Sequence, residues 1–486
     1  METTNQDFRI YTKTGTLTST VNIDNFFSAS GGQTGKYFDP HILFDKNYNR
    51  FVICIDGNVS NGNSGLFVAV SQTADPTSNW YVYGFDAIGN ANDFLDYPLM
   101  GVNTNWVVIT GNDFLNAGGT TGKIYVLNRA SLYSGTLGTV STFTDANGFA
   151  IAPAHTYDAS QTVEYLVTEY NGNSGGNGYV TIGSITGSAT APAYNAGSNV
   201  GVNQPWSETS VAAVQMGSTN TIEDGDTRIG NAVYINGSLW FCHTAFLPAS
   251  SPTYSGVCWW QVNPATLTVQ QFGRIATIGK FCYYPSIAVN TNGAALLNYC
   301  ISSTGIYSSA AYSYHASTDA ANTMQTEYVY KSGLAGYYKT LGGSRNRWGD
   351  YFGAAIDPSD NSFWGFGEWA NTGNNWATQV VHVPSDGPCF AAASFTNSVD
   401  TSCGTPFTVT FANTSTSADT FLWYFGDGTT STLANPSHTY TTAGTYSVKL
   451  VAISTGTCGK DSITKNNLVN IGSQFPCTVI MPVSGT

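Results

Sequence analysis

Charged residues are scarce: Asp, Glu, Lys and Arg make up only 10% of the 486 residues. Long helices need many Glu, Lys, Ala and Leu residues, and the chain has few of them. Gly, Ser, Thr and Asn are abundant instead, and aromatic residues reach 14%. Because Tyr, Thr, Val and Phe fit half-buried pleated surfaces, this composition predicts an all-β chain with many turns. A hydrophobic content of 42% excludes a disordered chain.

Basic residues are few as well, since 17 Lys and Arg stand against 30 Asp and Glu and give a net charge of −13. Nucleic acids and anionic membrane surfaces both require clustered basic residues, so we exclude them as partners. No apolar run reaches the length of a membrane span, and no membrane insertion is expected. The start of the chain, METTNQDFRIYTKTG, has no apolar signal core. An export signal is therefore expected to have been removed or to lie outside this chain.

Motifs for metal or nucleotide chemistry are missing. The sequence has no CxxC, HExxH or phosphate-binding Gly/Lys loop. The six His are far apart, and a lone His is more often a core or turn residue than a ligand. We therefore expect no cofactor. Calcium is the alternative, because Asp224 and Asp226 lie in an oxygen-rich turn.

The nine Cys are spaced in a way that predicts disulfides. Four pairs each bracket one hairpin or the C-terminal segment: Cys242 with Cys258, Cys282 with Cys300, Cys403 with Cys458, and Cys389 with Cys477. Cys54 is left over as a buried thiol. Four disulfides would indicate an oxidising, extracellular compartment. The alternative is that all nine are small buried side chains.

A repeated pattern runs through residues 1–385. Each copy has a polar or aromatic residue near a Pro or Tyr, a short apolar strand, an Asn/Asp turn and a second apolar strand. Six copies are visible, and they begin at Tyr37, Leu95, Ala154, Asp224, Phe281 and Arg347. A period of about 60 residues with four short strands per unit is typical of a β-propeller. We predict six blades, with seven as the alternative if the long gap between residues 155 and 228 hides one.

The two ends of this region are expected to close the ring. FRIYTKTGTLTSTVNI (8–23) has the pattern of a strand pair, and WATQVVHVP (376–384) of one more strand. Placing them in one blade would remove the free sheet edges. The predicted domains are then 1–385 as the propeller, 386–477 as a second domain and 478–486 as a tail.

The stretch TFLWYFGDGTTSTLANPSHTYTTAGTYSVKLVAI (420–453) combines alternating strands with a tight Asp-Gly turn. With the strand patterns on both sides it gives about seven short strands, which predicts a β-sandwich. Asp427 and His438 therefore have turn and loop roles in this interpretation, and we expect them to be structural rather than catalytic.

Three segments of this stretch resemble the signature of a PKD domain: WYFGDG (423–428), NPSHTY (435–440) and GTYSVKL (444–450). The resemblance covers about residues 390–472. It implies an immunoglobulin-like sandwich of the kind that serves as a spacer or surface-binding module in secreted bacterial proteins.

The first 385 residues resemble a family of secreted Bacteroidetes propeller proteins, in which Asp-Pro and Tyr-Pro blade openings recur. The late segment RWGDYFGAAIDPSDNSFW (347–364) belongs to the same pattern. The resemblance implies secreted or cell-surface localisation and export by type IX secretion. The C-terminal sorting domain of such proteins would have been cleaved or lie beyond this chain.

In a propeller the innermost strands meet at a central channel, and the blade openings line one mouth of it. The residues expected to bind a ligand there are Tyr37, Asp39, Tyr97, Arg228, Tyr284, Arg347 and Trp348. The candidate catalytic residues are Asp96, Asp226 and Asp350, because paired carboxylates can serve acid–base chemistry on a sugar. The structural alternative is that each Asp binds backbone N–H groups of the next blade, while Arg228 and Arg347 neutralise Asp226 and Asp350.

These observations predict a non-enzymatic binding or adhesion module, or a subunit of a larger surface assembly. Its propeller would present a surface for an extracellular glycan or a surface protein, and the PKD domain would be a spacer. The alternative is an enzyme, a polysaccharide hydrolase or lyase that uses the Asp, Arg and Tyr side chains of the mouth. The sequence lacks the SxDxGxTW boxes and the three-Arg cluster of sialidases.

Overall fold

The computed structural model describes residues 1–388, 391–454 and 460–472. They belong to two compact units, Met1–Asp386 and Gly387–Thr486. Helices among the described residues are short, and none combines the length and hydropathy of a membrane span. The model is nearly all-β, as predicted.

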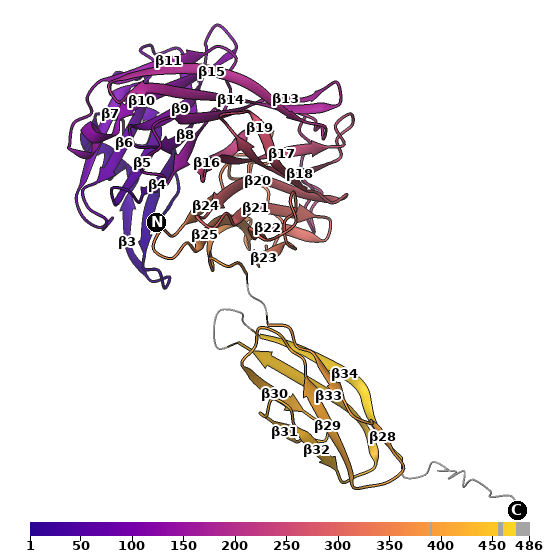
Figure 1. The fold of residues 1–486 in the computed structure, drawn as a ribbon. Coiled ribbons are helices and arrows are strands. Elements are labelled where there is room, and N and C mark those ends of the chain that lie inside the picture. The colour runs from indigo at the N-terminus through magenta and orange to yellow at the C-terminus, as the bar shows by residue number, and fades with distance from the viewer. Residues whose placement is uncertain (389–390, 455–459, 473–486) are drawn as a thin grey trace, which may run out of the picture. The chain divides into compact units, whose positions relative to one another are not determined.

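The first unit is built from small antiparallel sheets that follow one another along the chain (Figure 1). The first three are β1–β3 (Glu2–Thr3, Asp7–Tyr11, Leu17–Asn22), β4–β7 (Phe38–Asp45, Arg50–Asn58, Ser64–Ser71, Trp80–Asp86) and β8–β11 (Phe94–Val102, Trp106–Phe114, Thr120–Asn128, Val140–Asp145). The next two are β12–β15 (Ala152–Thr156, Glu164–Ser174, Asn177–Ser188, Ala191–Val202) and β16–β19 (Ile229–Ile235, Ser238–Leu247, Tyr254–Asn263, Thr268–Ile275). The last two are β20–β23 (Lys280–Val289, Ala295–Ser303, Ile306–His315, Tyr328–Lys331) and β24–β26 (Gly353–Ile356, Phe363–Asn371, Asn375–Val383). The short helices are α1 (Ile23–Phe27), η1 (Ser28–Ser30) and α2 (Arg129–Tyr133).

The first strands of successive sheets lie side by side around a common centre. β4 contacts β8, β8 contacts β12, β12 contacts β16, β16 contacts β20, and β20 contacts β24. β12 and β16 even pair directly, in parallel, from Ala154 opposite Ala232 to Thr156 opposite Tyr234. Each of the six sequence copies forms one of these sheets, and in Figure 1 the chain colour passes around the unit in the same order. The first unit is therefore a β-propeller.

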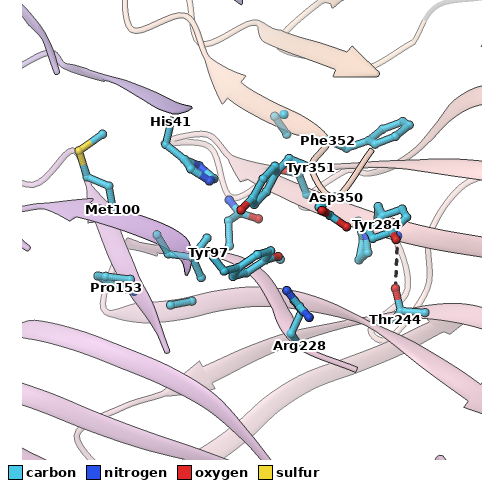
Figure 2. A pocket seen from close by; sticks show the side chains of 18 of the residues that line it. His41, Tyr97, Met100, Pro153, Arg228, Thr244, Tyr284, Asp350, Tyr351 and Phe352 are labelled. Atoms are coloured by element: carbon cyan, nitrogen blue, oxygen red, sulfur yellow. Dashed lines mark hydrogen bonds between the residues drawn. The ribbon is translucent and has the colours of Figure 1, made fainter. Parts of the chain in front are cut away.

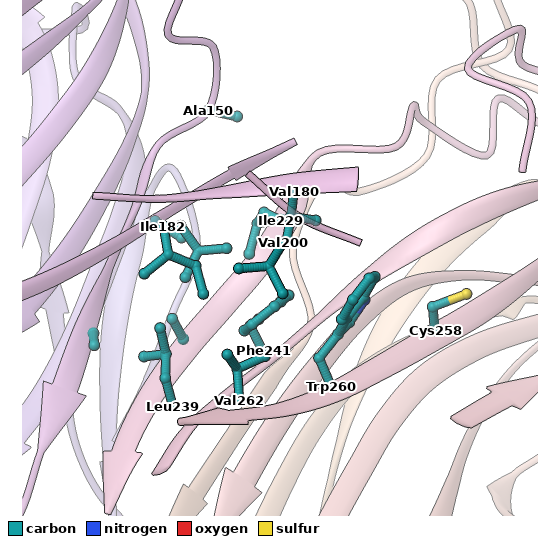
Figure 3. Packing of buried hydrophobic residues seen from close by; sticks show 14 of the residues in the cluster. Ala150, Val180, Ile182, Val200, Ile229, Leu239, Phe241, Cys258, Trp260 and Val262 are labelled. Carbon is teal, nitrogen blue, oxygen red and sulfur yellow. The ribbon is translucent and has the colours of Figure 1, made fainter. Parts of the chain in front are cut away.

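Neighbouring sheets bury their faces against each other, which explains the long apolar strands. β17 is buried along its whole length. Leu239 and Phe241 point toward β12–β15, whereas Trp240 points toward β20–β23. Because successive side chains on a strand alternate between faces, a strand packed on both faces has apolar residues at nearly every position. Figure 3 shows the core between β12–β15 and β16–β19.

The ring closes differently from the prediction. The N-terminal strands β1–β3 and the last strand β26 belong to separate sheets. The prediction that they share one blade is therefore wrong. β1–β3 packs through Phe8 and Ile10 on the face of β4–β7 opposite β8–β11. Side chains span the closure: the Tyr351 hydroxyl donates to Asp39 over 2.8 Å, and the Lys13 ammonium lies 2.6 Å from Asp357. The gap between residues 155 and 228, which is fully described, contains long β13–β15 strands and a loop but no further sheet.

The predicted disulfides Cys242–Cys258 and Cys282–Cys300 are wrong, since all four thiols are free and buried. Cys258 lies opposite the residue that follows Cys242, and Cys300 lies opposite the residue that follows Cys282. An offset of one residue places two strand side chains on opposite faces of a sheet. Cys258 accordingly lies in the core of Figure 3, whereas Cys242 lies in the core on the other face. Cys54 is a free buried thiol, as predicted.

The second unit is a β-sandwich. One sheet contains β27 (Phe395–Asn397), β29 (Phe407–Asn413) and β32 (Ser437–Tyr440), and the other contains β28 (Thr401–Ser402), β34 (Lys460–Ile471), β33 (Gly444–Ile453), β30 (Thr420–Tyr424) and β31 (Thr430–Ser431). Trp423 fills the core and donates its indole N–H to the carbonyl of Leu433 over 3.0 Å. Asp427 accepts the backbone N–H of Thr429 and lies 2.7 Å from His438 Nε2. These contacts agree with the predicted structural roles of Asp427 and His438.

Cys403 is disulfide-bonded. Its predicted partner Cys458 lies outside the described residues, as do both members of the predicted pair Cys389–Cys477.

Candidate functional site

A cavity lies at the centre of the propeller, where its six first strands meet (Figure 2). Its volume is about 120 Å³, and it opens to solvent. β4, β8, β12, β16, β20 and β24 all contribute to the wall, together with the loop segments before β16 and β24. The polar side chains that line it are His41, Tyr97, Asp226, Arg228, Asn231, Thr244, Tyr284, Ser286, Asp350 and Tyr351.

A bulge in the first strand sets the direction of three of the predicted site residues. Asp39, Tyr97 and Tyr284 each precede a Pro and have left-handed φ values of 54°, 61° and 50°. At each of these places the pairing with the second strand shifts register. Proline cannot donate to the ladder, and a bulge re-aims the neighbouring side chain. Strained backbone repeated at the rim of a cavity is typical of a functional region.

Arg228 is held rigidly at the edge of the cavity. Its Nε and Nη2 groups donate to the two oxygens of Asp226, each over 2.6 Å. The guanidinium carbon lies 4.1 Å from the centre of the Tyr97 ring, as Figure 2 indicates. Burial by itself lowers the pKa of Arg228, but the bonds to Asp226 and the nearby Tyr97 outweigh it and raise the pKa further above its usual range. The group is therefore a permanent, oriented donor.

Tyr351 connects the last sheet to the first. Its ring stacks on Tyr97 with centres 4.9 Å apart and meets the His41 ring edge-on at 4.6 Å (Figure 2). Its hydroxyl donates to Asp39. Burial lowers the pKa of His41 to about 4, so this imidazole is neutral at physiological pH.

A second ion-pair network lies beside the cavity. Arg347 Nη2 is 3.2 Å from Asp350 Oδ2, and Arg347 Nε is 3.7 Å from Glu223 Oε2. Arg345 also donates to Glu223. The Tyr284 hydroxyl donates to the backbone carbonyl of Glu223 over 3.4 Å. Two guanidinium groups thus share two carboxylates beside the cavity.

Three carboxyl groups in or beside the cavity, those of Asp39, Asp96 and Asp350, have pKa values raised above the usual range. Burial raises the pKa of Asp39 to about 7, and the nearby charges of Asp96 and Asp350 add to the effect. Burial also raises the pKa of Asp96 and of Asp350. Desolvation disfavours a charged carboxylate, and like charges reinforce the shift.

A side pocket lies on the other side of the Asp226–Arg228 pair, lined by Phe149, Glu169, Glu208 and Thr227. Burial, followed by the charge of Glu208, raises the pKa of Glu169 to about 8. The Glu208 carboxylate accepts the backbone N–H of Gly172 over 2.7 Å. The surroundings of Arg228 are therefore rich in carboxyl groups on both sides.

Five of the predicted site residues do not line the cavity. Three of them lie next to residues that do: Asp39 accepts the Tyr351 hydroxyl, Asp96 precedes Tyr97, and Arg347 pairs with Asp350. The other two lie elsewhere. Tyr37 is buried against Phe27 and Phe67 in the core between β1–β3 and β4–β7, where its hydroxyl donates to the carbonyl of Phe27. Trp348 is buried against Tyr337. Neither side chain lines the cavity. Both were predicted from an aromatic residue next to a blade opening, and a pattern of this kind does not distinguish a core aromatic from a cavity aromatic.

Calcium at Asp224 and Asp226 remains a prediction without geometric support. Asp226 uses both oxygens for Arg228, and Asp224 is buried. Within residues 1–388, 391–454 and 460–472, no group of three or more His, Cys, Asp or Glu side chains could hold a metal ion.

Side chains on second strands form hydrogen bonds to the backbone of the next sheet. In the described part of the chain, the Asp residues at the blade openings do not have this role. Asn112 on β9 accepts the N–H of Ala150, and Thr244 on β17 accepts the N–H of Tyr284. Asn298 on β21 donates to the carbonyl of Gly353. The structural alternative was therefore right for Asp226 and Asp350, which neutralise arginines, but the sheet-to-sheet bonds belong to other residues.

Sequence reasoning missed five polar residues of the lining, His41, Asn231, Thr244, Ser286 and Tyr351, and the Glu223–Arg345 pair beside it. Some of them lie close in sequence to predicted residues: Tyr351 directly follows Asp350, and His41 lies two positions after Asp39. Because a bulge interrupts the alternation at these openings, adjacent residues can face the same cavity. The sequence shows the Pro that marks the bulge, and that signal could have identified them.

The second unit matches the PKD domain family over residues 386–469. No curated protein sequence matches the chain. Similar solved structures include an exo-β-1,3-galactanase from Phanerochaete chrysosporium, 10% identical, covering 90% of this chain and 77% of that chain, with a TM-score of 0.28. They also include an endo-arabinase from Bacteroides thetaiotaomicron VPI-5482 (12% identical, covering 71% and 93%, TM-score 0.33) and a Trypanosoma rangeli sialidase (9% identical, covering 96% and 57%, TM-score 0.36). Likeness at this level leaves the question of function to the residues of the site.

Proposed function

We propose that the protein is a non-catalytic saccharide-binding module, in which the central cavity of the propeller holds a sugar and the PKD sandwich is a spacer. The observation that carries the proposal is the state of the carboxylates in and beside the cavity. Asp226 is bound by Arg228, Asp350 by Arg347 and Asp39 by Tyr351. Each is already engaged by a donor of the protein, whereas acid–base catalysis needs a carboxyl group that can exchange a proton with the substrate.

The same arrangement suits hydroxyl recognition. Arg228, Tyr284 and Asp350 offer donors and an acceptor from three different loops and strands around one cavity. Tyr97 and Tyr351 contribute aromatic surface, and aromatic rings provide apolar contact area with a polar tip. A rigid scaffold that fixes such groups needs little rearrangement on binding, which favours affinity.

A hydrolase or lyase is the second candidate, and one observation favours it. Asp39 has a pKa of about 7 and lies between Tyr351 and the carboxyl groups of Asp96 and Asp350. A carboxyl group that titrates near neutrality is suited to general acid–base catalysis.

The experiment that separates these candidates measures binding and turnover on the same purified protein. We expect a panel of immobilised polysaccharides to retain the protein, with no release of reducing ends or unsaturated sugars over long incubation. Turnover that is abolished in the Asp39→Asn variant would favour the enzyme. Absence of binding to every polysaccharide would refute the proposed function.

We further propose secretion to the surface of a Bacteroidetes bacterium by the type IX route, where the protein would join a larger assembly of surface proteins. The PKD domain match and the sequence resemblance support this proposal. Protease shaving of intact cells of the source bacterium, followed by peptide mass spectrometry, would test it. Peptides found only after cell lysis would contradict it.

A further inference from the structure

The charges around the cavity have a definite balance. Three guanidinium groups lie at its edge, and each has a carboxylate partner: Arg228 with Asp226, Arg347 with Asp350, and Arg345 with Glu223. Additional carboxyl groups lie close by without a guanidinium of their own. They are Asp39, Asp96, Glu169 and Glu208. Seven carboxyl groups therefore lie in and around the cavity, compared with three guanidinium groups.

An anionic ligand would meet two obstacles here. It would have to displace Asp226 from a two-point contact with Arg228, or share that guanidinium with it. It would also add a negative charge to a cluster in which the pKa of Asp39 is raised first by burial and then by repulsion from Asp96 and Asp350. Two like charges about 6 Å apart near a protein surface repel by about 3 kcal/mol.

We propose that the cavity selects uncharged saccharides and rejects saccharides that carry a carboxylate or sulfate on the bound residue. This inference rests on the proposed function and specifies its ligand class. Neutral hydroxyl groups can donate to Asp350 and accept from Arg228 without breaking either ion pair. Asp226 neutralises the charge of Arg228 and so sets the specificity for uncharged ligands. The guanidinium remains available as a hydrogen-bond donor.

The test uses matched glycans that differ in one acidic group, such as lactose and 3′-sialyllactose, or neutral xylan and glucuronoxylan, on a microarray. We expect the wild type to bind the neutral member at least about tenfold more tightly, which corresponds to about 1.4 kcal/mol. The Asp226→Asn variant exposes the Arg228 charge and should reduce this preference by about tenfold or more. Asp75→Asn, on an exposed loop between β6 and β7, removes the same charge elsewhere and should leave the preference unchanged.

A second measurement on the wild type alone keeps the inference testable if Asp226→Asn does not fold. Salt screens the repulsion between partly exposed charges. The ratio of the affinities for the neutral and the acidic glycan should therefore decrease at high ionic strength. Equal or tighter binding of acidic glycans would overturn the inference and leave saccharide binding intact. Absence of binding to every glycan would overturn the proposed function and, with it, this inference.

Discussion

Asp39 makes the stability of the propeller depend on pH in an unusual direction. In the folded protein its pKa is about 7, compared with an ordinary value of 3.8. Folding therefore favours the protonated form. The stabilising effect is fully present below the ordinary value, and it is lost as the pH rises from there through about 7.

The magnitude follows from the two pKa values. A difference of about three pH units corresponds to about 4 kcal/mol, which is an upper limit because Asp39 keeps some access to solvent. Part of this loss has already occurred at pH 5. Between about pH 5 and about pH 8 the contribution of Asp39 should fall by about 3 kcal/mol.

Asn is a suitable replacement because it tolerates the left-handed backbone at this position and can still accept a hydrogen bond from the Tyr351 hydroxyl. We expect Asp39→Asn to gain stability relative to the wild type as the pH rises, by about 3 kcal/mol more near pH 8 than near pH 5. For a unit of this size, about 3 kcal/mol corresponds to a shift of about 4 °C in melting temperature. Differential scanning calorimetry across this pH range measures the effect.

The control is Asp75→Asn. Thr77 lowers the pKa of Asp75, so this substitution should destabilise the protein slightly at neutral pH instead of stabilising it. If the difference in stability between the wild type and Asp39→Asn is the same at both pH values, the reasoning is refuted. That result would mean that Asp39 is solvated and charged in the folded state.

Three further predictions concern other parts of the chain. Tyr351→Phe removes the only donor shown on Asp39 among the described contacts, so it should destabilise the propeller by about 1–3 kcal/mol in urea unfolding, more at pH 8 than at pH 5; equal loss at both pH values would contradict this. Thiol titration of the unfolded, unreduced protein should detect at least the five free cysteines Cys54, Cys242, Cys258, Cys282 and Cys300, and fewer would show that some of them pair. Trp423→Ala should destabilise the sandwich by about 3–5 kcal/mol and leave the propeller transition unchanged; a shift of both transitions would show that the units unfold together.

The sheets of the propeller could be predicted from sequence because their signal is local. A strand such as 238–247 is apolar at nearly every position, since it is buried on both faces, and turn residues separate it from the next strand. The sandwich was predictable for the same reason, together with the specific spacing of Trp423, His438 and Tyr440.

The disulfides and the ring closure could not be predicted because they depend on register and on distant contacts. Whether Cys242 and Cys258 share a face is decided by one residue of register, which the turn between the strands sets. Tyr351 and Asp39 are 312 positions apart, and nothing local in either segment marks the contact. Their place next to blade openings predicts Tyr37 and Trp348 at the mouth, but both lie in loops before a strand and are buried by packing against aromatic residues distant in the sequence.

The most direct test of the central claim is a crystal structure of the protein soaked with a neutral oligosaccharide that it binds. The account predicts an intact sugar in the central cavity, in contact with Arg228 and Tyr284, and with the Asp226–Arg228 pair unbroken. A sugar bound on another surface, or a cleaved product in the cavity, would contradict it.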